Sequence, residues 1–264
     1  MLKTRESLCS SVINHSSYVC LVELYLSVDE LISSSRIQQV DLQCNNKVLV
    51  EDVLVGSTGL LDSCSNLLEF LSLMKKNIRT LQSAFRRKGA AIDATGEAHI
   101  LDYVTYRKKA KKNIVQYLRS LEKMERKTES CVVSGEDHDL SVVIGVLREI
   151  VTATISVFRS LLFCLSGKTK LDKGFSLISR LVPTSRQVHC KTSEITTDVD
   201  MVDVTLRSLQ KNIKNYGSKS IDLQMVSERL LNLDHQIECY EIELDNVFRR
   251  LIQTRVSLLN ILGN

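Results

Sequence analysis

Apolar residues recur along this chain at alternating steps of three and four, a spacing typical of helices that pack through a heptad seam. The longest run covers 223–261, more than five repeats with one polar position at Thr254. Its members are Leu223, Val226, Leu230, Leu233, Ile237, Tyr240, Leu244, Val247, Leu251, Thr254, Leu258 and Ile261. The run predicts one long helix that buries a continuous stripe.

Three further runs share this spacing, and two weaker segments also favour helix. The first run comprises Val50, Val53, Ser57, Leu60, Cys64, Leu67, Leu71, Met74, Ile78, Leu81 and Phe85. The others comprise Leu140, Val143, Leu147, Ile150, Thr154, Val157, Leu161 and Cys164, then Val199, Val202, Leu206, Leu209, Ile213 and Tyr216. Residues of about 98–127 follow the pattern less well because Arg107 interrupts it, and a helix near 6–33 is plausible. We therefore expect an all-α fold, an elongated multi-helix bundle with long heptad-patterned helices.

The last helix carries a second apolar stripe beside its seam, formed by Phe248, Ile252, Leu259 and Leu262. A helix that is apolar on two sides needs neighbours on both, so we expect this C-terminal helix to be packed on two faces. We favour other helices of the same chain as its neighbours over another chain. Arg255 lies in line with the second stripe, and we expect it to extend its charge to solvent or to pair with a carboxylate.

Composition supports this helical interpretation. Proline occurs once, at Pro183, and only 10 of the 264 residues are glycine, so helix breakers are scarce. We expect a single helical domain over 1–264, with flexible linkers near 89–97, 128–139 and 166–195, where polar and turn-forming residues cluster. The linker of 166–195 contains the short amphipathic segment FSLISRLV, and its Ser, Lys and Arg content is compatible with phosphorylation.

The eight cysteines are widely spaced and have no metal-ligand spacing, as expected for a reduced protein. The start MLKTRESLCSSVINHSSYV lacks the uninterrupted apolar core of a secretory signal, so we expect a cytoplasmic location. The most apolar stretch, LSVVIGVLREIVTATISVFRSLLFCL, contains Arg148, Glu149 and Arg159. Each such charge costs roughly 2.5 to 3.5 kcal/mol near a bilayer centre. We therefore do not expect this stretch to span a membrane, although a membrane-associated surface stays open.

Positive charge concentrates in 75–127, which has 15 Lys and Arg against 5 Asp and Glu in a chain of net charge +4. One interpretation is a basic face for acidic lipid, RNA or an acidic partner. The simpler one, which we favour, is a solvated surface paired with acidic helices such as 222–245. If the region is functional, the candidate interaction surface is Arg107, Lys108, Lys109, Lys111 and Lys112. No nucleic-acid motif accompanies these residues, so no specific nucleic acid is expected.

The sequence contains no group of residues that favours catalysis. SGKT at 166–169 matches the end of a phosphate-binding loop, but Leu162 stands where that motif needs glycine, and a helical pattern replaces the required strand. The five histidines are isolated, and no nucleophile, base and orienting group can be assembled from local spacing. We expect no enzyme activity, no cofactor and no metal site.

Four blocks of sequence resemble one family. FRRLIQTRVSLLNIL (248–262), VLREIVTATISVFRSLL (146–162), GLLDSCSNLLEFLSLMKKNIRTLQSAFRRK (59–88) and YRKKAKKNI (106–114) are similar to blocks of the plant BYPASS-related family. The similarity runs in order over about 20–262. It implies a helical plant protein with no established enzymatic activity that is connected with root and shoot development. It defines no catalytic or ligand-binding residues.

The chain departs from the family at its start, where relatives usually carry a leader containing Ser, Arg and Pro, so we expect the leader to be absent or truncated. The resemblance implies a non-enzymatic helical scaffold or interaction protein with an unknown protein partner. The alternative is a peripheral membrane protein that binds anionic lipid through the basic 75–127 region. Self-association is a further option.

Overall fold

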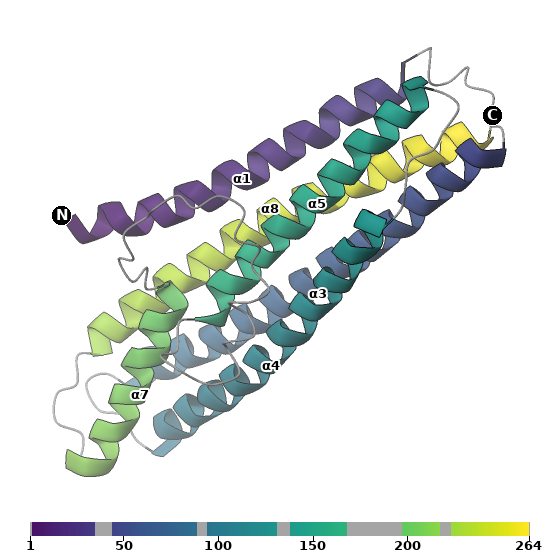
Figure 1. The fold of residues 1–264 in the computed structure, drawn as a ribbon. Coiled ribbons are helices and arrows are strands. Elements are labelled where there is room, and N and C mark those ends of the chain that lie inside the picture. The colour runs from purple at the N-terminus through teal and green to yellow at the C-terminus, as the bar shows by residue number, and fades with distance from the viewer. Residues whose placement is uncertain are drawn as a thin grey trace, which may run out of the picture. The chain divides into compact units, whose positions relative to one another are not determined.

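A computed structural model describes residues 2–34, 44–88, 94–130, 138–167, 197–216 and 223–263 (Figure 1). The helices of these ranges are α1 (Leu2–Ile32), α3 (Cys44–Lys88), α4 (Ala94–Ser130), α5 (His138–Ser166), α7 (Asp198–Tyr216) and α8 (Leu223–Gly263). No strand occurs among the described residues. The prediction of an all-α, multi-helix fold is confirmed.

The heptad seams form the core. On α8, every seam position from Val226 to Ile261 is buried, including the polar Thr254, and on α3 the same holds from Val50 to Phe85. Regular three-and-four spacing keeps these side chains on one face of each helix, so a single stripe is removed from water along its whole length.

The chain divides into two compact units. Unit 1 contains Met1–Glu69, Arg119–Ser160 and Glu241–Asn264, and unit 2 contains Phe70–Leu118 and Leu161–Tyr240. Helices α3, α4, α5 and α8 each contribute residues to both units. The expected single domain stays a prediction.

The expected linkers lie largely outside the described residues, which omit 89–93, 131–137 and 168–196. The segment FSLISRLV lies outside them as well. Helix α4 begins earlier and ends later than the sequence suggests, since it includes 94–97 and 128–130.

In unit 1, two buried polar contacts fix α1 against its neighbours. The Tyr25 hydroxyl lies 2.8 Å from Thr154 Oγ1 on α5, and Thr254 Oγ1 on α8 donates to Asp29 Oδ1 at 2.7 Å. Both threonines occupy seam positions, where the pattern alone predicts an apolar side chain. Because buried polar groups are costly when unpaired, these contacts favour one register of α1 along α5 and α8.

The prediction of a second packed face on α8 needs correction. On the second stripe, Ile252 and Leu259 are 42% and 46% exposed, and Arg255 Nη1 donates to Leu54 O and Ser57 Oγ of α3 rather than to a carboxylate. The helix that buries a wider face is α5. Beside its seam, it also buries Ile144, Val151, Ile155, Phe158, Leu162 and Leu165. A wide apolar face of this kind is typical of a central helix.

Helix α5 also contains the one described stretch that is long and apolar enough to cross a membrane by length and composition, Ser141–Ser166, with a mean hydropathy of 1.8. Core helices pass the same test. Arg159, within this stretch, is buried and pairs with Glu125 of α4 at 2.6 Å.

Candidate functional site

The basic residues of α4 divide into an inward and an outward set. Arg107 and Lys111 point into unit 2, where Arg107 is only 3% exposed. Arg107 therefore does not belong to an exposed interaction surface, and that part of the prediction is wrong. It does not interrupt the seam either, because it occupies the position between Tyr103 and Ala110, both of which are buried.

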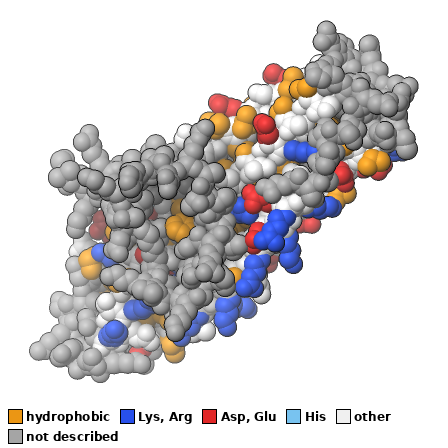
Figure 2. All heavy atoms as spheres, in the orientation of Figure 1, with side chains coloured by type: hydrophobic (Ala, Val, Ile, Leu, Met, Phe, Trp, Pro, Cys, Tyr) orange, Lys and Arg blue, Asp and Glu red, His pale blue; other side chains and the backbone are white. Residues whose placement is uncertain are grey.

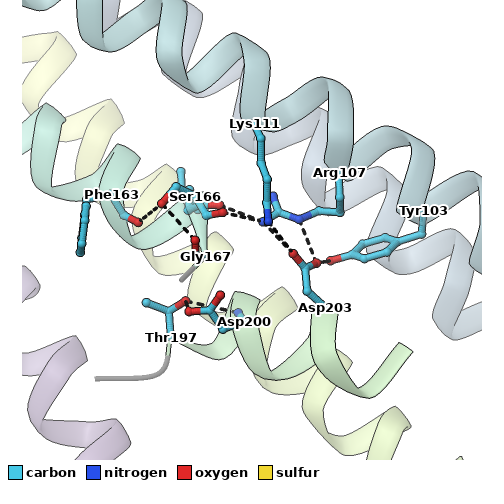
Figure 3. A network of polar contacts seen from close by, with 10 residues as sticks. Tyr103, Arg107, Lys111, Phe163, Ser166, Gly167, Thr197, Asp200 and Asp203 are labelled. Carbon is cyan, nitrogen blue, oxygen red and sulfur yellow. Dashed lines mark hydrogen bonds and ion pairs between the residues drawn. The ribbon is translucent and has the colours of Figure 1, made fainter. Parts of the chain in front are cut away.

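Arg107 forms an ion pair with α7 and donates hydrogen bonds to both α7 and α5 (Figure 3). Its Nε donates to Asp203 Oδ1 of α7 at 3.0 Å, and its Nη2 donates to Asp203 Oδ2 at 3.3 Å. The same Nη2 donates to the carbonyl oxygens of Leu165 and Ser166, at 3.1 and 3.3 Å. These are C-terminal carbonyls of α5, which lack partners within the helix and attract positive charge. One guanidinium thus joins α4, α5 and α7.

A second cation and a tyrosine share the Asp203 carboxylate. Lys111 Nζ lies 3.5 Å from Asp203 Oδ2, and the Tyr103 hydroxyl donates to Oδ1 at 3.5 Å. Burial lowers the pKa of Lys111, with Arg107 and Arg207 adding to the effect and Asp203 opposing it. Burial lowers the pKa of Arg107, but the Asp203 carboxylate together with Tyr103 and Tyr106 more than offsets burial, so that pKa is raised. Asp203 is therefore the shared acceptor for three side chains of α4.

The start of α7 belongs to the same buried cluster. Thr197 precedes the helix, accepts from the Asp200 backbone N–H at 3.3 Å, and donates its hydroxyl to Asp200 Oδ2 at 3.1 Å. Thr197 is thus the N-cap residue of α7. Gly167, directly after α5, has a φ of +70°, and a Cβ added there would lie 2.7 Å from Asp200 Oδ1. Glycine is required here by both backbone conformation and space.

The outward set comprises Lys108, Lys109 and Lys112, all exposed. Within the described part of the chain, none of the three forms an ion pair. Figure 2 shows Lys and Arg side chains gathered along this helix, and α4 can be located by comparison with Figure 1. We call Lys108, Lys109 and Lys112 the α4 lysine face.

Two other cations of the basic region are paired with α8. Lys75 lies 3.4 Å from Glu238 of α8, and Arg79 lies 3.0 Å from Asp234 of the same helix. These contacts agree with the simpler interpretation, in which basic surface is balanced by the acidic 222–245 segment. That interpretation fits Lys75 and Arg79, whereas no described carboxylate forms an ion pair with the α4 lysine face.

The described residues offer no metal site, since no group of three or more His, Cys, Asp or Glu among them could hold an ion. In the SGKT sequence, Ser166 is the last residue of α5 and Gly167 follows the helix. Leu162 is buried within the same helix. A helix therefore stands where a phosphate-binding loop requires a strand.

Sequence reasoning missed Asp203 and Asp200 because the pattern shows their charge but not their neighbours. One signal was present: Arg107 occupies a seam position, and a buried arginine requires a carboxylate or carbonyl partner. The identity of that partner depends on which helices meet.

The comparisons with known proteins agree with the resemblance seen in the sequence. No curated protein matched the chain, and no solved structure matched it. A family model described as Protein BPS1 matches residues 18–261, nearly the stretch over which the sequence resembles BYPASS-related proteins. Because this match covers most of its length, the chain belongs to the plant BPS1 family.

Proposed function

We propose that this chain is a non-enzymatic helical interaction protein of plant cells that acts in root and shoot development by binding an acidic partner protein through the α4 lysine face. Membership of the BPS1 family fits a plant development protein without a known biochemical activity. The observation that carries the proposal is that Lys108, Lys109 and Lys112 are exposed and form no ion pair with a described residue, while Arg107 and Lys111 anchor the inward side of the same helix.

Anchoring supports recognition because it presents the lysines on a rigid element. Arg107 contacts α5 and α7 through three acceptor residues, so α4 is held in place before any partner arrives. A preorganised surface loses less conformational freedom on binding than a flexible one. Three unpaired cations within five residues favour a partner that carries several carboxylates or phosphates.

The test replaces Lys108, Lys109 and Lys112 by Glu together and measures quantitative affinity capture from root extract. Lys111 stays unchanged, because its ammonium contacts Asp203 and its loss would disturb the buried cluster. We expect specific partners of the wild type to be depleted at least tenfold.

The matched control replaces three other exposed cations, Lys47, Lys76 and Arg86, by Glu. It changes the net charge equally and should retain the partners. Equal capture by the wild type and the lysine-face variant, with helix content unchanged by circular dichroism, would refute this placement of the binding surface.

The second candidate is binding of the same face to an anionic membrane. The α4 lysine face also favours this function, since each Lys near an anionic bilayer contributes about 1 kcal/mol. Flotation with vesicles of neutral lipid, with and without phosphatidylserine, separates the two candidates. Co-flotation only with phosphatidylserine, lost in the lysine-face variant, would favour the membrane, whereas detergent-resistant capture of a protein would favour the partner.

A further inference from the structure

Helix α8 presents a second heptad pattern toward solvent, opposite its buried seam. Within unit 1, the pattern runs through Ile242, Asp245, Arg249, Ile252, Val256 and Leu259, again at alternating steps of three and four. We call these six residues the outer stripe. Its four apolar members Ile242, Ile252, Val256 and Leu259 are 59%, 42%, 50% and 46% exposed. Scattered exposed apolar residues are ordinary, but regular heptad spacing is the pattern of a helix that packs against another helix.

The charges of the outer stripe limit the kind of surface that can pack against it. Asp245 and Arg249 are one turn apart and form a 2.7 Å ion pair, and both remain partly exposed. The stripe thus has one acidic and one basic position in its centre, with apolar residues on both sides. Neither an anionic membrane nor a strongly charged partner fits a stripe with no net charge. A surface with the same pattern does fit.

Two copies of the outer stripe are complementary in only one direction. In a parallel pair, Asp245 would face Asp245 and Arg249 would face Arg249, and like charges at a helix interface are unfavourable. In an antiparallel pair centred between these two residues, each Asp245 faces the Arg249 of the other copy, and each Ile242 faces the Ile252 of the other copy. The antiparallel register therefore satisfies both ionic positions and pairs Ile242 with Ile252, whereas Val256 and Leu259 lie outside this paired centre, opposite Glu238 and His235 of the other copy.

We propose that α8 mediates self-association, with the outer stripes of two copies packed antiparallel about a two-fold axis between Asp245 and Arg249. From Ile242 to Leu259 the stripe is about 27 Å long at 1.5 Å per residue. One helix pair of this length covers less than the roughly 1,200 to 2,000 Å² buried in stable complexes. The association is therefore reversible and depends on protein concentration.

The first experiment measures the mass of the full chain by sedimentation velocity over a concentration series. We expect the wild type to move from 29.8 kDa toward twice that mass as its concentration rises. Ile252→Glu should keep the chain at 29.8 kDa at every concentration, because it places a carboxylate opposite Ile242. The control Val142→Glu changes an apolar residue of α5 in the same unit that is at least as exposed as Ile252, and this variant should associate like the wild type.

The second experiment tests direction and register. Asp245→Arg should weaken association, since two arginines then face one another, and the double variant Asp245→Arg with Arg249→Asp should restore it. A chain with both Ile242→Cys and Ile252→Cys should form disulfides between position 242 of one copy and 252 of the other, identified by peptide mapping.

Two outcomes overturn the proposal of self-association through this stripe. One is a wild type that stays monomeric up to its solubility limit. The other is association that Ile252→Glu leaves unchanged, with helix content verified by circular dichroism. Disulfides formed only between two copies of position 242, or only between two copies of position 252, would overturn the antiparallel register.

Discussion

At the scale of single residues, buried polar side chains join helices that are far apart in the chain. Arg107 and Asp203 join α4 to α7, and Thr254 donates to Asp29 of α1 at a position where the heptad needs only an apolar residue. Each of these groups is costly to bury alone and acceptable only beside its partner. They select one arrangement of helices from the many that apolar seams allow.

Asp29 makes stability depend on pH. Burial raises its pKa above the ordinary value, with Thr254 and Arg250 opposing that shift. The fold thus favours the protonated form, and this contribution is fully present below the ordinary aspartate pKa and is lost as pH rises through the raised one. We expect Asp29→Asn, which keeps an oxygen acceptor for Thr254, to raise the melting temperature at neutral pH.

The measurement is thermal unfolding of both proteins at neutral and at acidic pH. The difference between them should shrink as pH falls toward the ordinary aspartate pKa, because the wild-type carboxyl is then protonated as well. A melting-temperature difference that is the same at both pH values would contradict this role for Asp29.

At the scale of elements, helix ends decide how α5 and α7 meet. The N-cap residue Thr197 starts α7, and the left-handed backbone of Gly167 follows the end of α5. Both features are local. They lie together because Arg107 binds the last carbonyls of α5.

Two glycines in and next to α5 should respond in opposite directions to alanine. Gly167→Ala places a Cβ 2.7 Å from Asp200 Oδ1 and forces a left-handed backbone on alanine, so we expect a loss of about 1–3 kcal/mol. Gly145→Ala, inside the helix with nothing within 4 Å of its added Cβ, should gain about 0.5–1 kcal/mol. Urea unfolding measures both, and effects of the same sign would refute this account of Gly167.

At the scale of the whole molecule, four helices supply residues to both compact units. When the part of such a helix in one unit unfolds, the helix loses the backbone hydrogen bonds that join this part to the part in the other unit. We therefore predict that the described helices unfold in one cooperative transition, as the single-domain expectation requires.

Cys64 provides the readout. Its thiol is buried in unit 1 and donates to Leu244 O at 3.5 Å, and burial raises its pKa to about 12. Arg107→Leu in unit 2 leaves Asp203 buried without its main partner and should cost about 3–5 kcal/mol. If unfolding is cooperative, a thiol reagent should label Cys64 roughly a hundredfold or more faster in Arg107→Leu than in the wild type. Exposed Cys20 and Cys239 should label quickly in both proteins, and unchanged protection of Cys64 would show that the units open separately.

The sequence by itself determined the helices and their buried stripes, because three-and-four periodicity fixes which side chains share a face wherever the helix is placed. The seams of α3 and α8 show this, as every described position from Val50 to Phe85 and from Val226 to Ile261 is buried. Only the tertiary structure decided that Arg107 points inward to Asp203 and that α5, not α8, buries the wider face. Those outcomes depend on contacts between residues far apart in the chain, which no local spacing encodes.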